Sequence, residues 1–364
     1  MDSKKLLEEL QKERKNIKTD SYSMSIGEVI NLYKDGELKL NPAFQRLYRW
    51  DDNQKTDFIE SILLGIPIPE IFVAQKGDGK WDIVDGVQRI STLLQLTGDL
   101  KEKEPLVLKE TTYLPSIVDF TWETLPLEVK RILRRAKIGI NIILTENSIQ
   151  SQYELFKRLN TGGLHLEDQE IRNCLLIMLD ENFYNVINEL KKYDNFKECL
   201  PISSEKYDKE YHMELIIRYL IAKVGNVNYD DYNISQDKLS VFFDKEITKI
   251  IESNTLKLQE EVEIFKKTFD YLANTLGKDS FKKYNEDKHT FEGAFSPTSY
   301  ELIASGLGKN IDKISEKSEG DFRNDIIKMY KDERYINSAK RGVKAISRFK
   351  NLTKFSEEYF TNEI

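Results

Sequence analysis

The spacing of apolar residues changes near residue 164. From about residue 167 onward, apolar side chains recur at the 3.6-residue period of an α-helix, with breaks near residues 201–208, 225–235, 277–297 and 306–310. Before residue 164, short alternating runs typical of strands are mixed with helical runs. The pattern predicts an α+β protein, with a mixed α/β domain over residues 1–164 followed by an all-α domain over residues 165–364. We find no internal repeat and no low-complexity linker, so we expect packed rather than tethered subdomains.

The elements of the first domain follow from caps, turns and periodicity. The expected helices are 1–20, 25–36, 53–64, 87–97, 128–136 and 147–159, and the expected extended segments are 38–40, 71–75, 81–84 and 138–142. Asp51 and Asp52 can cap helix 53–64, and Gly65 ends it. The glycines at 77 and 79 predict a hairpin turn between strands 71–75 and 81–84.

The composition is that of a globular protein. Hydrophobic residues make up 40% of the 364 residues and charged residues 32%, and 18 phenylalanines with 18 tyrosines are too many for a disordered chain. No apolar run approaches the ~18 residues of a membrane-spanning helix, and residues 1–20 lack the apolar core of a signal peptide. We therefore expect a cytoplasmic protein with no membrane partner.

Metal-ligating residues are few and scattered. Cys174 and Cys199 form no CxxC pair, and His165, His212 and His289 lie far apart without neighbouring ligands. We therefore assign no cysteine- or histidine-based metal site. The net charge of −7 excludes a uniformly basic nucleic-acid coat but allows a local basic patch.

The turn from strand 81–84 into helix 87–97 is the main candidate for chemistry. Asp85 and Gly86 lead a buried strand directly into a helix N-terminus, where free N–H groups and the helix dipole favour an anion. Arg89 can add a bidentate phosphate contact, and Asp85 can cap the helix or hold Mg²⁺ beside phosphate oxygens. The alternative is a purely structural turn, in which Asp85 caps the helix and Arg89 is an exposed charge.

Two further segments are candidates for nucleotide contacts. Residues 44–50 place Gln45, Arg46 and Arg49 among three aromatic side chains, which suits base stacking and phosphate binding. Alternatively, the aromatics anchor the loop to the core and the arginines pair with the aspartates that follow. The second segment is a glycine-containing loop that can turn backbone amides toward a phosphate or simply join two helices, and it contains Asn160, Thr161, Gly162 and Gly163.

The C-terminal region contains a basic run. Residues 340–354 include six basic side chains and no acidic one. Helical spacing would place Arg341, Lys344 and Arg348 on one face, where they and Lys340 could bind a nucleic-acid backbone. A solvated helix face is the alternative.

The motifs, taken in order, resemble those of the N-terminal domain family of GmrSD-type restriction systems, also called domain of unknown function 262. The resemblance rests on Asn-Pro-Ala-Phe-Gln-Arg-Leu-Tyr-Arg-Trp at 41–50, on Ile-Glu-Ser-Ile-Leu-Leu-Gly-Ile-Pro-Ile-Pro at 59–69, on Val-Asp-Gly-Val-Gln-Arg at 84–89, and on Phe-Lys-Arg-Leu-Asn-Thr-Gly-Gly at 156–163 with Gln-Glu-Ile-Arg-Asn at 169–173. It implies a ParB/sulfiredoxin-like first domain that binds a nucleoside triphosphate (NTP). Asp85, Gln88 and Arg89 then become the catalytic positions, and Gly86 joins the nucleotide contacts.

The resemblance also implies a role in DNA restriction or anti-phage defence. Many relatives carry a C-terminal HNH nuclease, which needs a histidine base beside further metal ligands. None of the three histidines here has that context, so we expect a separately encoded nuclease or effector partner, with NTP and DNA as the other ligands. Two hypotheses remain: an NTP-hydrolysing regulatory component, or a non-catalytic DNA- or nucleotide-binding interaction module. For hydrolysis, the residues suggest only Asp85 or Glu60 as a general base.

Overall fold

The chain forms two compact units. The computed structural model describes residues 4, 6, 7, 10, 19–40, 50–101, 103–144, 149–159, 167–234 and 236–363. The units comprise Met1–Leu166 and Glu167–Ile364, here called unit 1 and unit 2. Unit 1 holds a five-stranded sheet with helices and unit 2 is mainly helical, which confirms the expected α+β class. The boundary expected at residue 164 lies outside the described residues.

Unit 1 contains both strands and helices along its sequence. Its elements are β1 (Thr19–Ser25), α2 (Ile26–Lys34), β2 (Leu38–Lys39), α4 (Asp52–Leu63), β3 (Ile71–Gln75), β4 (Trp81–Asp85), α5 (Val87–Thr97), α6 (Leu127–Arg135), β5 (Lys137–Ile143) and α7 (Ile149–Leu159). The expected helix at 53–64 is confirmed. It is capped by Asp51, whose side chain accepts a hydrogen bond from the Gln54 N–H, and the Gln54 side-chain oxygen accepts one from the Asp51 N–H. Helix α5 has the expected bounds.

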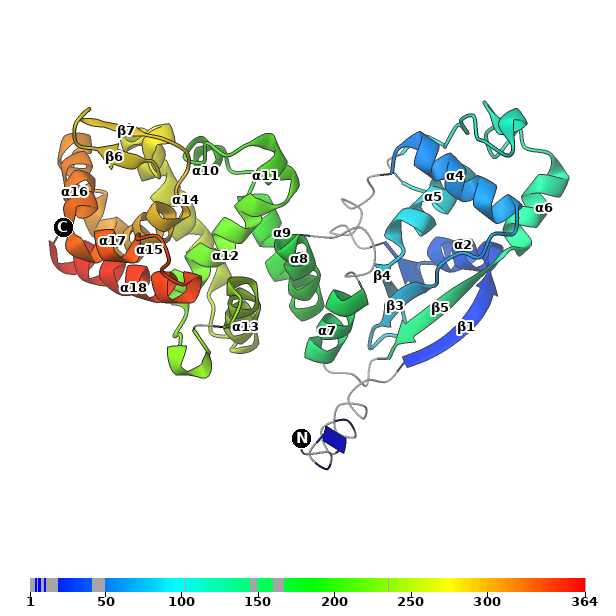
Figure 1. The fold of residues 1–364 in the computed structure, drawn as a ribbon, viewed down its shortest axis with the longest axis horizontal. Helices are drawn as coiled ribbons and strands as arrows, with labels where there is room; N and C mark the ends of the chain where they lie inside the picture. The colour runs from blue at the N-terminus through cyan, green and yellow to red at the C-terminus, as the bar shows by residue number, and fades with distance from the viewer. Residues whose placement is uncertain are drawn as a thin grey trace. The chain divides into compact units, whose positions relative to one another are not determined.

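The sheet is mixed. Its strand order is β1-β5-β3-β4-β2, with β1/β5 and β3/β4 antiparallel and β3/β5 and β2/β4 parallel. Helices α4, α5 and α6 lie together on one side of it (Figure 1), and α2 packs against α6. The alternating apolar residues of the central strands, such as Val73, Ile83 and Ile140, are at most 2% exposed, so they form the core under this helical layer.

Strand β1 differs from the sequence-based expectation. The N-terminal helix was expected to extend to residue 20, but Thr19 already belongs to β1, which pairs with β5 along its whole length. The segment Thr-Asp-Ser-Tyr-Ser-Met-Ser has little apolar alternation because it is an exposed edge strand, with only Met24 buried. Backbone pairing with β5, not side-chain burial, makes it a strand.

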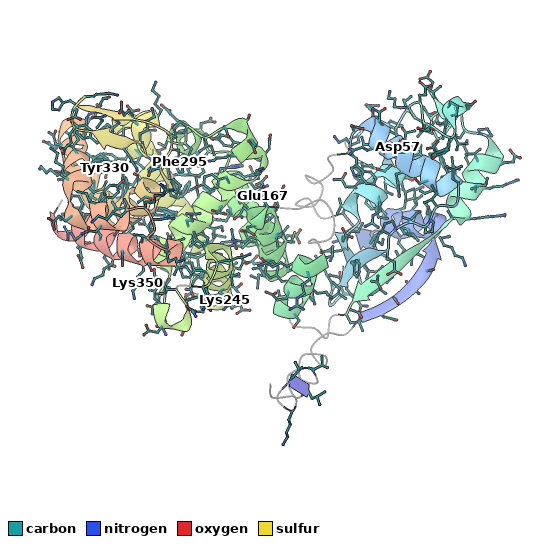
Figure 2. The ribbon with its side chains drawn as sticks, in the orientation of Figure 1. Asp57, Glu167, Lys245, Phe295, Tyr330 and Lys350 are labelled. Atoms are coloured by element: carbon teal, nitrogen blue, oxygen red, sulfur yellow. The ribbon has the colours of Figure 1, made fainter. Side chains whose placement is uncertain are left out.

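Unit 2 is built from helices of five to eighteen residues. They are α8 (Asp168–Leu179), α9 (Glu181–Leu190), α10 (Asp194–Glu198), α11 (Ser204–Asp208), α12 (Tyr211–Val224), α13 (Leu239–Glu252), α14 (Leu258–Thr275), α15 (Pro297–Ile314), α16 (Glu319–Lys331), α17 (Glu333–Ser338) and α18 (Ala345–Glu358). Aromatic side chains such as Phe295 and Tyr330, labelled in Figure 2, lie in its interior.

Two of the expected helix breaks have a different structure. The break at 277–297 contains an antiparallel hairpin, β6 (Lys283–Asn285) with β7 (Thr290–Glu292). Helix α15 runs through the break expected at 306–310, with non-helical backbone angles only at Asn310. Gly306 is needed for packing rather than for a turn, since a Cβ there would lie 2.3 Å from Cδ2 of Phe360.

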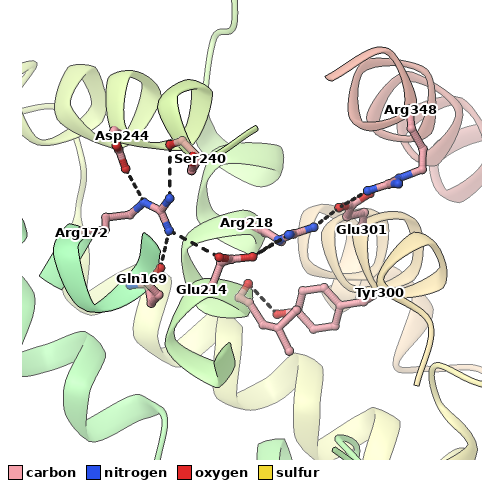
Figure 3. A network of polar contacts seen from close by, with 10 residues as sticks. Gln169, Arg172, Glu214, Arg218, Ser240, Asp244, Tyr300, Glu301 and Arg348 are labelled. Carbon is pink, nitrogen blue, oxygen red and sulfur yellow. Dashed lines mark hydrogen bonds and ion pairs between the residues drawn. The ribbon is translucent and has the colours of Figure 1, made fainter. Parts of the chain in front are cut away.

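A buried ionic network joins five helices of unit 2 (Figure 3). It connects α8, α12, α13, α15 and α18 through Arg172, Asp244, Glu214, Arg218, Glu301 and Arg348. The Arg172 side chain is 0% exposed, and its Nε donates to Asp244 Oδ1 at 2.7 Å. Arg218 Nη2 donates to Glu214 Oε1 at 2.5 Å, and Arg218 Nη1 donates to Glu301. Three arginines therefore face three carboxylates in the core.

Candidate functional site

The β4–α5 turn has the geometry of a tight strand-to-helix connection. Gly86 adopts a left-handed backbone with φ of +97°, and a Cβ at this position would lie 2.4 Å from Cγ2 of Ile71. Only glycine fits both the conformation and the contact. Helix α5 begins at Val87, and no side chain in the described part of the chain caps it. The first turn of a helix presents backbone N–H groups and the positive end of the dipole, an arrangement that favours an anion.

Arg89 is a clamp rather than an exposed helix charge. Its side chain is 12% exposed, and Nη2 donates to Asp85 Oδ2 at 2.9 Å. Nη1 donates to the carbonyl of Glu70 at 3.0 Å and to the carbonyl of Pro69. Burial lowers the pKa of Arg89 and Asp85 partly offsets this shift, but a guanidinium stays charged in proteins. These bonds use three of its five N–H donors.

Asp85 does not cap helix α5, which corrects one interpretation of this residue. The N-cap is Gly86, and the Asp85 carboxylate instead faces the Arg89 guanidinium one turn along the helix. The Asp85 side chain is 36% exposed, so it remains accessible to a ligand. The site thus combines a helix N-terminus, a partly satisfied guanidinium and a solvent-accessible carboxylate.

Gln88 ties the turn to the segment that precedes α4. Its Oε1 accepts a hydrogen bond from the Trp50 N–H at 3.1 Å. The Trp50 ring packs against Phe58 of α4 with centroids 5.5 Å apart, so at least this aromatic anchors its segment. The other predicted contributors, Gln45, Arg46 and Arg49, lie outside the described residues.

The glycine-containing loop also lies outside the described residues. The predicted contacts from Asn160, Thr161, Gly162 and Gly163 therefore stay predictions. Arg172, the arginine of the Gln-Glu-Ile-Arg-Asn motif, lies in the core of unit 2 beside Asp244. Its side chain is fully buried and is not available to a nucleotide.

Glu60 has a structural role. It is 6% exposed, and its Oε1 accepts hydrogen bonds from the N–H groups of Tyr113 and Leu114 at 2.9 and 2.7 Å. Burial raises the pKa of this carboxyl, but the hydrogen bonds to the carboxylate outweigh burial and the pKa is lowered. Glu60 anchors a loop to α4, and a buried, stabilised carboxylate is a poor general base.

Glu70 contacts the turn through its backbone carbonyl, which accepts a hydrogen bond from Arg89, and its side chain pairs with Asn141. Neither residue was found from the sequence. Glu70 Oε2 accepts a hydrogen bond from Asn141 Nδ2 at 2.6 Å. The Glu70 side chain crosses Gly139 of β5, where a Cβ would lie 2.7 Å from Glu70 Cγ. An isolated glycine in a strand pattern often marks such a close approach, and this signal in 138–142 could have pointed to the contact.

The basic run does not form one helical face. Helix α18 begins at Ala345 with Lys344 as its N-cap, and residues 339–344 are not helical, so Arg341 and Lys344 precede the helix. Arg348 is helical but half-buried, and its Nε donates to Glu301 Oε2 at 3.3 Å. Lys340 donates to Asn337 Oδ1 at 2.7 Å. The prediction of a shared face was wrong because it assumed an uninterrupted helix across Gly342.

The exposed lysines of this run nevertheless keep their charge at the surface. Lys344, Lys350 and Lys354 are exposed, and the Lys350 ammonium lies 5.2 Å from the Tyr229 ring centroid (Figure 2). Contact of the run with DNA stays a prediction.

The thiols and the possible metal ligands can be assessed within the described residues. Cys174 and Cys199 are buried, and burial raises the pKa of both thiols. Within the described ranges, no group of three or more His, Cys, Asp and Glu side chains is arranged to hold a metal ion. In the same residues, no helix combines the length and apolar character needed to cross a membrane.

Comparison with known families agrees with the motifs. Residues 26–177, from α2 into α8, match the family described as GmrSD restriction endonuclease, N-terminal domain. No curated protein and no solved structure matches the chain. The family match implies a component of a restriction or defence system. Over residues 26–177, the chain therefore carries a domain of the GmrSD restriction endonuclease N-terminal family.

Proposed function

We propose that this protein is the nucleotide-binding, NTP-hydrolysing regulatory component of a prokaryotic DNA-restriction or anti-phage defence system. The family match supports the system. The observation that carries nucleotide binding is the N-terminus of α5, which begins after Gly86 and has the charged Arg89 guanidinium in its first turn. The base of the nucleotide is not specified by these residues.

A phosphate fits this turn in two respects and conflicts with it in one. The N-terminus of α5, with the positive end of its dipole, and the charged guanidinium of Arg89 both suit an anion. The Asp85 carboxylate would repel phosphate oxygens, and Mg²⁺ would reverse this repulsion by binding both. We therefore propose that NTP binds together with Mg²⁺, which Asp85 holds and which would neutralise the phosphate charge.

Binding of each NTP to the purified chain tests this proposal. Arg89→Ala should weaken binding by roughly ten- to a hundred-fold, the equivalent of one charge-assisted hydrogen bond. Because Arg89 also binds the Pro69 and Glu70 carbonyls, thermal melting must show that the variant is folded. Arg131→Ala, an exposed arginine of α6, is the matched control and should bind like the parent. Unchanged affinity in folded Arg89→Ala would refute the site.

Asp85→Asn tests the metal directly. Asparagine keeps an acceptor for the Arg89 N–H and removes the charge. If Asp85 holds Mg²⁺, the variant should bind NTP more weakly than the parent in Mg²⁺ but at least as tightly in EDTA, where the repulsion is gone. Equal affinities of the two proteins under both conditions would contradict the proposed metal role.

The second candidate function is a nucleotide- or DNA-binding module without turnover. The mutual pairing of Arg89 and Asp85 favours it, since the two charges already satisfy each other. Release of inorganic phosphate from the bound NTP, measured with and without DNA, separates the two functions.

We also propose that cleavage of DNA is performed by a separately encoded nuclease. Plasmid DNA incubated with the chain, NTP and Mg²⁺ or Mn²⁺ should remain uncut, including plasmid with modified bases. Cutting that is lost in Asp85→Ala would contradict this proposal and make the chain itself the nuclease.

A further inference from the structure

We infer that Glu70, held by Asn141, positions and deprotonates the water that attacks the terminal phosphate of the bound NTP. This inference rests on the proposed function and adds a residue to its site. Glu70 is the last residue before β3, directly after the proline-containing segment that Arg89 clamps.

The orientation of the Glu70 carboxylate is defined on two sides. Asn141 Nδ2 donates to Oε2 at 2.6 Å, and this bond does not use the lone pairs of the other carboxylate oxygen, Oε1. Gly139 provides the space for the side chain, because a Cβ there would lie 2.7 Å from Cγ and 3.1 Å from Oε1. Glu70 is nevertheless an exposed residue. An exposed carboxylate with a defined orientation can accept a proton from a water molecule.

Glu70 adjoins the β4–α5 turn through its backbone. Arg89 Nη1 lies 3.0 Å from the Glu70 carbonyl oxygen, so the guanidinium and the start of β3 are in contact. Across the sheet, Phe72 pairs with Asn141 of β5 on one side and with Asp85 of β4 on the other. Since neighbouring strands lie ~4.8 Å apart, Asn141 and Asp85 are roughly 10 Å apart. A triphosphate chain anchored at Asp85 and Arg89 can extend over this distance toward Glu70.

The other acids beside the turn are already occupied. Glu60 is buried and bound to two backbone N–H groups, and Asp85 faces Arg89. Among the described acids in contact with the turn, Glu70 combines exposure with a neutral partner. The Asn141 amide orients the carboxylate without neutralising its charge.

The proposed step is hydrolysis of the terminal phosphate by one water molecule. The oxygen of water forms a bond to the terminal phosphorus, and its proton passes to Glu70. The bond from that phosphorus to the bridging oxygen breaks, and the electron pair leaves with the nucleoside diphosphate. Glu70 then returns its proton to solvent. General-base catalysis of this kind typically contributes 10²–10⁴-fold to a rate.

Three variants of the full chain test the inference. Glu70→Gln should lower the rate of phosphate release at least ~100-fold and change the NTP dissociation constant less than about threefold. Gly139→Ala displaces the Glu70 side chain without changing any charge, and should lower the rate in the same way. Glu110→Gln, which removes an exposed carboxylate elsewhere in unit 1, is the matched control and should leave the rate unchanged. Thermal melting checks that each variant is folded.

The pH profile distinguishes a base from a structural residue. In the parent, the rate should fall at low pH as Glu70 becomes protonated, and this limb should be absent in Glu70→Gln. Turnover in Glu70→Gln within threefold of the parent, or NTP binding by the parent without turnover, would overturn the inference and leave nucleotide binding intact. A parent that binds no NTP refutes the proposed function instead.

Discussion

Replacing Glu301 with glutamine should destabilise unit 2 by about 3 kcal/mol. The Glu301 side chain is 0% exposed and accepts hydrogen bonds from Arg218 and Arg348. Glutamine preserves the size of the side chain and one acceptor oxygen, but it removes the negative charge. The network would then contain three arginines and two carboxylates.

The magnitude follows from how well each arginine can reach water. Breaking a buried ion pair costs about 3–5 kcal/mol, because the remaining charge stays buried without compensation. The Arg218 side chain is only 9% exposed, but it retains Glu214 at 2.5 Å. The Arg348 side chain is 24% exposed and can turn to solvent. These two alternatives place the expected loss at the lower end of the range.

A double variant tests the charge argument itself. Glu301→Gln combined with Arg348→Gln restores equal numbers of positive and negative side chains in the network. We expect it to recover at least half of the stability that Glu301→Gln alone loses. Arg348→Gln alone is the matched control, since it removes the same arginine while Glu301 and Arg218 remain paired.

The distribution of tryptophan allows the two units to be followed separately. Trp50, Trp81 and Trp122 all lie in unit 1, so their fluorescence reports its unfolding. Far-UV circular dichroism is dominated by helices, most of which belong to unit 2. In urea, Glu301→Gln should move the dichroism midpoint down by about 1 M and leave the fluorescence midpoint in place. An unchanged dichroism midpoint, or a double variant no more stable than the single one, would refute the reasoning.

Three further predictions concern the turn, acid and DNA. Gly86→Ala should lower the stability of unit 1 by roughly 2–4 kcal/mol in fluorescence-monitored urea unfolding. Alanine would have to adopt the left-handed backbone of Gly86, and its Cβ would displace the Ile71 side chain. A variant as stable as the parent would contradict this. Burial raises the pKa of Glu214, but the charges of Arg218 and Arg172 outweigh burial and the pKa is lowered. The contribution of Glu214 to stability is therefore present above the ordinary carboxyl pKa and is lost as pH falls through the lowered pKa. Glu214→Gln should flatten this loss of stability at low pH in a series of thermal melts. Arg341→Glu with Lys344→Glu should weaken duplex DNA binding and reduce the salt slope by about one unit per lost contact, and identical salt series would show that the run is only a solvated surface.

Much of the local structure of unit 1 is encoded within a few residues. Asp51 and Gln54 form a capping box across three residues, and Gly98 ends α5 as expected. Helix caps and turns involve groups at most four or five residues apart, so a short sequence window contains all partners. For the same reason, the β4–α5 turn and its glycine could be predicted, and ordered motifs were sufficient to predict the family.

The partners of charged side chains were decided by tertiary structure. Arg89 was correctly placed in the first turn of α5, but its contact with the Glu70 carbonyl spans 19 residues. Arg172 reaches Asp244 across 72 residues, and Arg348 reaches Glu301 across 47. Long guanidinium side chains have many accessible partners in an unfolded chain, and packing of the helices selects among them.

The polar edge strand β1 and the Glu70–Asn141 pair were likewise decided by tertiary structure. Strand β1 gains its hydrogen bonds from β5, more than a hundred residues away in sequence, and its own side chains carry almost no apolar pattern. Glu70 and Asn141 are 71 residues apart and meet only because β3 and β5 are parallel neighbours. Sequence periodicity records which face of an element is buried, because burial is a property of each residue. Which strands become neighbours depends on closing long loops around a common core, and only the folded chain determines that.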